Sequence, residues 1–175
     1  MKPDFDLELP LILKSEGGFV NNPHDPGGAT NYGITQRVYD AFRKTSGQSG
    51  RPVSVRYISS TDVALIYRQQ YWNAVRGDET PTGIDYCLFD EAVNSGPVKS
   101  IIDLQTALKV KADGQFGMVT LGALLAVNDH AALINRICDL RLNWLHRIKT
   151  WRFFGKGWSN RIAFVRAGAL KMAGG

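Results

Sequence analysis

Apolar residues recur every three or four positions along most of the chain, a pattern that predicts amphipathic α-helices. In the segment 130–149 the apolar positions form one continuous stripe, made of Leu133, Ile134, Ile137, Leu140, Trp144, Leu145 and Ile148. The same periodicity predicts further helices over 5–16, 36–44, 61–75, 83–95 and 98–108, a short helix that ends at 126, and a last helix over 158–172. Only the stretch between Phe19 and Ile34 reads as extended. We therefore expect a mainly α protein, a helical bundle with a small β-hairpin or ribbon near its N-terminus.

Side chains that cap helices mark several of the predicted starts. Thr35, Ser59, Thr82 and Asp129 each stand directly before a periodic segment, where a side-chain oxygen can accept a hydrogen bond from a free backbone N–H. At Gly96-Pro97 one predicted helix ends and the next begins. We expect it to separate a catalytic domain, residues 1–96, from a helical lobe, residues 97–175, that packs on it.

Two acidic residues in the stretch 11–36 are candidates for catalysis. Glu16 ends the first predicted helix on its apolar stripe, and a carboxyl held against apolar neighbours retains its proton more readily, as a general acid must. Asp25 lies in a Pro- and Gly-rich turn, where solvent favours the ionised form. Glycoside hydrolysis uses two such carboxyl groups in contrasting environments. The alternative is that Glu16 is an ordinary solvated residue and Asp25 a turn former.

The residues around these acids resemble a known signature. The run Glu16-Gly17-Gly18, followed by Asn22-Pro23-x-Asp25-Pro26-Gly27-Gly28-x-Thr30-Asn31-x-Gly33-Ile34-Thr35, is similar to glycoside hydrolase family 108, the family of phage endolysins and related N-acetylmuramidases. The resemblance implies a lysozyme-like α+β fold with Glu16 as general acid. It also implies that Asp25 and Thr30 position or activate water. The Asp25–Thr30 spacing is one residue shorter than is usual in phage-type lysozymes, so the roles of Thr30 and Thr35 stay open.

A weaker resemblance covers the second half of the chain. Phe89-Asp90-x-Ala92-Val93-Asn94-Ser95-Gly96-Pro97 and the turn Asp113-Gly114-Gln115-Phe116-Gly117 are similar to the predicted peptidoglycan domain that follows family 108 catalytic domains. The turn itself predicts glycines at positive φ and Phe116 in the core. The resemblance implies a peptidoglycan-binding lobe, and the alternative is that the lobe only completes the fold.

A saccharide cleft needs planar apolar surfaces and side-chain amides. Residues of these types near plausible cleft edges are Tyr32, Gln36, Tyr71, Trp72, Asn73 and Asn94. We expect Tyr71 and Trp72 to be exposed at a helix end, with core packing as the alternative for each aromatic residue. Asp90 and Glu91 are adjacent acids within an apolar helix. For Glu91, a buried ion pair with an arginine competes with a supporting role in the site.

The chain of 175 residues carries a net charge of +5, which suits polyanionic surroundings without identifying one. The basic segment 149–171 contains aromatic residues, among them Trp151, Phe153, Phe154 and Trp158, and either lies on an anionic envelope surface or is an ordinary surface helix. Without a nucleic-acid motif, we expect no nucleic acid as partner. We also expect a monomer without metal or organic cofactor, in which Cys87 and Cys138 are reduced and buried, with a disulfide between them as the alternative.

Together these patterns predict a peptidoglycan hydrolase that cleaves the β-1,4 bond between N-acetylmuramic acid and N-acetylglucosamine. A lytic transglycosylase and a non-catalytic protein that binds the wall or assists secretion are the alternatives. The first residues lack the features of a signal peptide, so we expect synthesis in the host cytoplasm and action on the cell wall after release.

Overall fold

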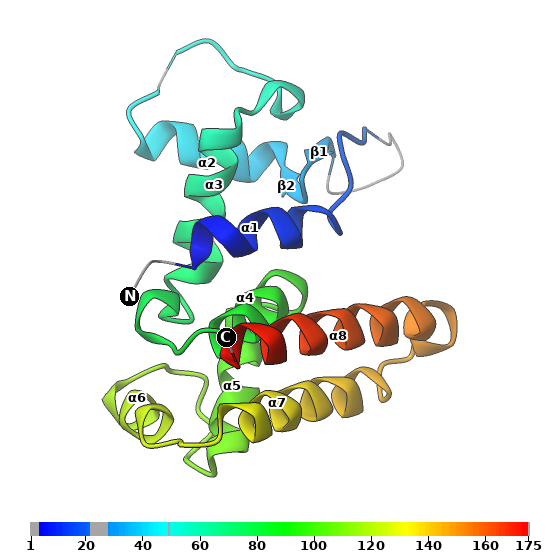
Figure 1. Ribbon diagram of the computed structural model, residues 1–175. Helices are drawn as coiled ribbons and strands as arrows, with labels where there is room; N and C mark the ends of the chain where they lie inside the picture. The colour runs from blue at the N-terminus through cyan, green and yellow to red at the C-terminus, as the bar shows by residue number, and fades with distance from the viewer. Residues whose placement is uncertain (1–3, 22–27, 49, 175) are drawn as a thin grey trace. The chain divides into compact units, whose positions relative to one another are not determined.

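The computed structural model describes residues 4–21, 28–48 and 50–174. These residues form α-helices and one two-stranded antiparallel sheet, so the predicted mainly α, lysozyme-like α+β class is confirmed (Figure 1). The chain divides into two compact units: an N-terminal unit, residues 6–70, and a C-terminal unit, residues 1–5 with 71–175. The predicted boundary at Gly96-Pro97 falls within the C-terminal unit. The assignment of catalysis to residues 1–96 stays a prediction.

The N-terminal unit is built around a short hairpin. It contains most of α1 (Phe5–Leu13), the strands β1 (Thr30–Asn31) and β2 (Ile34–Thr35), α2 (Gln36–Thr45), a 3₁₀ turn (Val55–Tyr57) and α3 (Ser60–Tyr67). Thr30 pairs with Thr35 and Asn31 with Ile34, and an isolated bridge joins Val20 to Thr30. The hairpin packs against α2 and against the 3₁₀ turn. Its core is formed by buried residues of these elements: Ile34, Tyr39, Phe42, Val55, Val63 and Ile66.

The C-terminal unit is a helical bundle around α4. A π-helical segment (Arg68–Trp72) leads into a 3₁₀ turn (Gly77–Glu79) and then into α4 (Ile84–Ser95), α5 (Pro97–Leu108), α6 (Met118–Leu125), α7 (His130–Leu145) and α8 (Trp151–Ala173). Nearly every residue of α4 is buried because this helix packs against α5, α7 and α8. Figure 1 shows α7 and α8 side by side. Not even α8, the longest described helix at 23 residues, is long and apolar enough to cross a membrane.

Three predicted caps are confirmed and one is wrong. The side chains of Thr35, Ser59 and Asp129 accept hydrogen bonds from backbone N–H groups in the first turns of α2, α3 and α7. Thr82 does not cap α4, because its hydroxyl donates to the Asp4 carboxylate at 2.7 Å. The predicted cap failed because a partner 78 residues distant in the sequence takes the hydroxyl.

Helix ends also depart from the periodic pattern. The predicted helix 61–75 is α-helical only to Tyr67 and then widens into the π-helical segment. The predicted helix 130–149 ends at Leu145, whereas α8 begins at Trp151 rather than 158. This early start is possible because the indole of Trp151 lies over Gly155, 2.5 Å from where a Cβ would stand. This contact joins residues four apart in the same helix and supports helix where two glycines disfavour it.

A single glutamine holds the turn that follows α5. Gln105 is buried, and its Nε2 donates to Asp113 Oδ1 at 2.9 Å, the Gln115 carbonyl at 3.0 Å and Thr120 Oγ1 at 3.1 Å. Its Oε1 accepts from the Gly114 N–H at 2.9 Å. Gly114 has φ +72°, as the sequence predicted, but the prediction is wrong for Gly117, which has φ −88°. Phe116 is only half-buried, beneath the guanidinium of Arg76.

Candidate active site

Glu16 lies beyond the first helix rather than at its end. The helix α1 stops at Leu13, and the following residues continue in tight turns in which the N–H of Glu16 donates to the Leu13 carbonyl at 3.2 Å. The expectation that Glu16 belongs to the apolar stripe of the helix is therefore wrong, because the backbone leaves the helix three residues earlier. Its side chain is half-buried against another part of the N-terminal unit.

The carboxyl group of Glu16 rests against the turn of the hairpin. Tyr32 and Gly33 connect β1 to β2 with φ +50° and +69°, the left-handed conformation that two-residue hairpin turns of this hand require. Glu16 Oε2 lies 3.0 Å from the position that a Cβ on residue 33 would occupy. Glycine at position 33 therefore both permits the turn and leaves room for the carboxyl group.

A tyrosine of α3 completes this arrangement. The hydroxyl of Tyr67, at the end of α3, lies 3.4 Å from the same Cβ position and donates to the carbonyl oxygen of Tyr32 at 2.8 Å. Three segments of the N-terminal unit thus converge on Gly33, and the Glu16 carboxyl lies where they meet. The sequence analysis did not assign Tyr67 to the site, because its only signal was a place on the buried side of α3.

Of the other two predicted catalytic residues, the structure describes only Thr30. Thr30 lies in β1, where its N–H and carbonyl pair with those of Val20 at 2.8 Å each. Thr35 uses its hydroxyl to accept from the Val38 N–H, so of the two threonines this one caps a helix. Asp25 lies outside the described residues. The roles of Thr30 and Asp25 therefore stay predictions.

Two side-chain amides of the stretch 11–36 support the hairpin. Asn31 is buried and its Nδ2 donates to the carbonyls of Val55 and Arg56, both at 3.2 Å. Gln36 donates to Asp40 Oδ1 and the Val53 carbonyl, both at 2.9 Å, and accepts from the Val55 N–H at 2.7 Å. The predicted substrate contact by Gln36 would require these bonds to be replaced. Tyr32, 38% exposed at the tip of the hairpin, keeps its aromatic ring available for a sugar.

The remaining predicted substrate residues lie in the C-terminal unit. The expected exposure of Trp72 is wrong: its indole is 0% exposed, packed edge-on against Phe5 and Phe89, and its Nε1 donates to Asp78 Oδ1 at 2.9 Å. Such a ring cannot stack on a sugar. Tyr71 is half-buried, and Asn73 and Asn94 are exposed.

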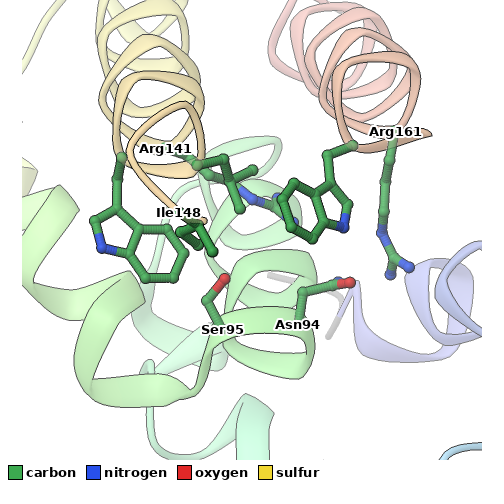
Figure 2. A pocket seen from close by; sticks show the side chains of 8 residues that line it. Asn94, Ser95, Arg141, Ile148 and Arg161 are labelled. Atoms are coloured by element: carbon green, nitrogen blue, oxygen red, sulfur yellow. The ribbon is translucent and has the colours of Figure 1, made fainter. Parts of the chain in front are cut away.

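Asn94 stands at the rim of a pocket of about 130 Å³ at the end of α4. Figure 2 shows Ser95 pointing from α4 towards Ile148 and Asn94 extending to the side of Arg161, with Arg141 and Arg161 reaching in from α7 and α8. The remaining lining residues are Trp144, Leu145 and Trp158. Two indoles beside an amide and two guanidiniums give the planar apolar walls and hydrogen-bond donors that saccharides require. Apart from Asn94, the lining residues were not predicted as site residues, because most of them come from the region of α7 and α8, distant in sequence from α4.

A buried ion-pair network supports one wall of the Asn94 pocket. Arg141 Nη1 binds Asp90 Oδ2 at 2.7 Å, and Arg161 Nη2 binds Asp90 Oδ1 at 2.8 Å. The two arginines therefore form their ion pairs with Asp90 rather than with its neighbour Glu91. The Nε of Arg141 is buried and has no hydrogen-bond partner among the described residues.

The carboxyl group of Glu91 has a pKa far above its ordinary value. Both of its carboxylate oxygens are buried, without a hydrogen-bond partner in the described part of the chain, and the nearest cation, Lys99 Nζ, lies 3.7 Å from Oε1. Burial raises the pKa of Glu91 to about 8; Asp103 adds to the rise, and Arg141 and Lys99 oppose it. The side chain is therefore mostly protonated at pH 7 and is buried within the C-terminal bundle.

Residues 9–96 match the sequence model of the family described as Glycosyl hydrolase 108. This is half of the chain. The chain belongs to glycosyl hydrolase family 108. It is also similar to Brucella abortus SagA, a protein of known structure, at 40% sequence identity and a TM-score of 0.81, over 99% of this chain and 97% of that one. None of the curated proteins matches the chain.

Membership of family 108 supports a glycoside hydrolase whose substrate is a glycan. All of the predicted catalytic and substrate residues, from Glu16 to Asn94, fall within the matched residues 9–96. The matched range takes in the whole hairpin of the N-terminal unit, and α4 with the first two residues of the Asn94 pocket. The helices α7 and α8, which supply the rest of that pocket, lie beyond it.

Proposed function

We propose that this family 108 protein is a peptidoglycan hydrolase, an N-acetylmuramidase that cleaves the β-1,4 bond between N-acetylmuramic acid and N-acetylglucosamine. The observation that carries the proposal is the Glu16 carboxyl, held by the turn at Gly33 and by Tyr67 within the family-matched part of the chain. A fixed, half-buried acid is suited to protonating a glycosidic oxygen. Glu16 is therefore the general acid of the proposal.

The rest of the proposed reaction follows from the two-carboxyl scheme of glycosidases. As the bond to the leaving oxygen breaks, Asp25 stabilises the oxocarbenium-like transition state or orients the attacking water, and Thr30 assists with its hydroxyl. Water adds to the anomeric carbon of muramic acid, and Glu16 recovers its proton. The Asn94 pocket, with its indoles and guanidiniums, supports binding of the glycan strand by the C-terminal unit.

The test is mass spectrometry of fragments released from purified peptidoglycan by wild-type protein, Glu16→Gln and an exposed-site control, Glu79→Gln. We expect reducing-end muramic acid from the wild type and the control, and at least a thousandfold less from Glu16→Gln. A folded and fully active Glu16→Gln protein would exclude Glu16 as the acid. Fragments with 1,6-anhydro ends would identify a transglycosylase, and release of none, with binding to insoluble wall, would identify a wall-binding protein.

The proposed setting is lysis of bacterial cell walls, as in a phage endolysin made in the cytoplasm and acting on the wall after release. Production of the chain inside bacteria tests this setting. We expect lysis only when the inner membrane is permeabilised, and lysis that depends on Glu16. Lysis by Glu16→Gln protein would show that the effect does not come from muramidase activity.

A further inference from the structure

Charge is distributed very unevenly along this chain. From Leu140 to the C-terminus the sequence contains eight Lys and Arg residues and no Asp or Glu. The preceding residues contain thirteen Lys and Arg against sixteen Asp and Glu. The net positive charge of the protein therefore resides entirely in its last 36 residues, which form the end of α7, the connection to α8, and α8.

The exposed part of this basic segment includes a pair of aromatic rings. Phe153 and Phe154, in the first turn of α8, are 67% and 55% exposed, and their ring centroids lie 6.4 Å apart. Further along α8 the apolar residues Ile162, Val165 and Ala169 are buried in the bundle. The later part of the helix thus packs its apolar residues into the core of the unit, whereas Phe153 and Phe154 remain exposed to solvent.

Basic residues flank the two phenylalanines along the chain. Arg147 and Lys149 in the connection, and Arg152 and Lys156 in α8, are all exposed, and the guanidinium of Arg152 lies 4.6 Å from the centre of the Phe153 ring. We call these four residues together with Phe153 and Phe154 the α7–α8 corner. Figure 1 shows the connection at one end of the paired helices α7 and α8.

We propose that the α7–α8 corner docks on the surface of an anionic lipid membrane. Phe153 and Phe154 enter the boundary between headgroups and acyl chains, where apolar side chains leave water, and the four basic residues bind lipid phosphates. Charge complementarity requires an anionic partner. The adjacent exposed phenylalanines favour a lipid surface over a purely polar polyanion, because only the lipid surface offers an apolar layer to both rings.

The experiment is flotation of the full-length protein with vesicles of phosphatidylglycerol and phosphatidylethanolamine, and with vesicles of phosphatidylcholine alone. We expect the wild type to bind the anionic vesicles at least tenfold more tightly than the zwitterionic ones. The double variant Phe153→Ser/Phe154→Ser should lose at least tenfold in affinity. Phe164→Ser is the matched control, since Phe164 is also exposed on α8, about 15 Å further along the helix axis, and its loss should change binding less than twofold.

Two further measurements keep the outcome unambiguous. Arg147→Gln/Lys149→Gln should weaken vesicle binding and reduce its dependence on salt, because fewer phosphate contacts are screened. Glu16→Gln should bind vesicles like the wild type, so failure of the proposed catalysis would leave this proposal standing. Equal binding to both kinds of vesicle would overturn it. So would unchanged binding by the folded double variant, or binding to DNA or heparin but not to anionic vesicles.

Discussion

The hydroxyl of Tyr67 donates a hydrogen bond of 2.8 Å to the carbonyl oxygen of Tyr32, a residue held at φ +50° in the hairpin turn. This bond ties the last residue of α3 to the tip of the hairpin within the N-terminal unit. The same hydroxyl lies beside Gly33, against which the Glu16 carboxyl rests. Tyr67 is therefore a positioning residue for the proposed general acid.

Tyr67→Phe should lower kcat for wall hydrolysis about tenfold with little change in KM, because the hairpin no longer fixes the carboxyl. Loss of one hydrogen bond should lower the free energy of unfolding by about 1 kcal/mol. The control is Tyr57→Phe, which removes the same hydroxyl from an exposed ring. Steady-state kinetics and urea unfolding would check both values, and a tenfold rise in KM without a change in kcat would contradict the positioning role.

Gly33→Ala tests the turn directly. An alanine at φ +69° costs about 1–2 kcal/mol, and its Cβ would stand 3.0 Å from Glu16 Oε2, so the carboxyl must shift. We expect at least a tenfold loss of kcat together with reduced stability. Gly50→Ala, at an open position in the same unit, should alter neither quantity measurably. Retention of full activity by Gly33→Ala would mean that Glu16 needs no such support.

The raised pKa of Glu91 predicts that the stability of the protein depends on pH. The folded protein holds this proton up to about pH 8, whereas the unfolded chain releases it near its ordinary pKa of 4.5, so the folded state binds more protons between these values. The free energy of unfolding should therefore fall as pH rises from about 4.5 to about 8, by up to about 1.4 kcal/mol per pH unit from this group.

Urea unfolding at several pH values would measure this slope. Glu91→Gln should flatten it. Glu79→Gln is the control, because Arg76 holds the pKa of Glu79 below its ordinary value, and its contribution is lost only at pH values below this window. A slope that is the same in wild type and Glu91→Gln would show that Glu91 is ionised in the fold.

Two aspartates offer a matched comparison of ion pairs. Asp90→Asn removes the carboxylate that pairs with Arg141 and Arg161 inside the bundle, and should lower the free energy of unfolding by about 3–5 kcal/mol. Asp139→Asn removes the partner of Arg166 at an exposed position, which should cost less than about 1 kcal/mol. Similar losses for both variants in a denaturant titration would contradict this difference.

Local patterns in the sequence predicted local structure well. The apolar stripe of 130–149 and the caps Thr35, Ser59 and Asp129 gave helices in the right places, because their causes lie within a few residues. Thr82 was missed because Asp4 takes its hydroxyl through a tertiary contact, and the early start of α8 was missed because Gly155 and Gly157 disfavour helix. The π-helical widening after Tyr67 has no periodic signal of its own.

In the candidate site, too, local sequence patterns were predictive and contacts between distant segments were not. Glu16 was predicted as the acid because the signature around it is dense, but its contact with Gly33 and the nearby Tyr67 joins segments 17 and 51 residues away, and sequence spacing did not indicate it. Trp72 was placed in the cleft by residue type alone, and the structure places it between Phe5 and Phe89. The Asn94 pocket, assembled from α4, α7 and α8, could be assigned only once the helices were packed.

The division of the chain into two units has a spectroscopic consequence. All four tryptophans, Trp72, Trp144, Trp151 and Trp158, belong to the C-terminal unit, and the N-terminal unit, residues 6–70, contains none. Intrinsic tryptophan emission therefore reports on the helical bundle alone. A single tryptophan introduced at the exposed Tyr57 would give the hairpin unit a signal of its own, so that the melting of the proposed catalytic half could be followed separately from that of its partner half.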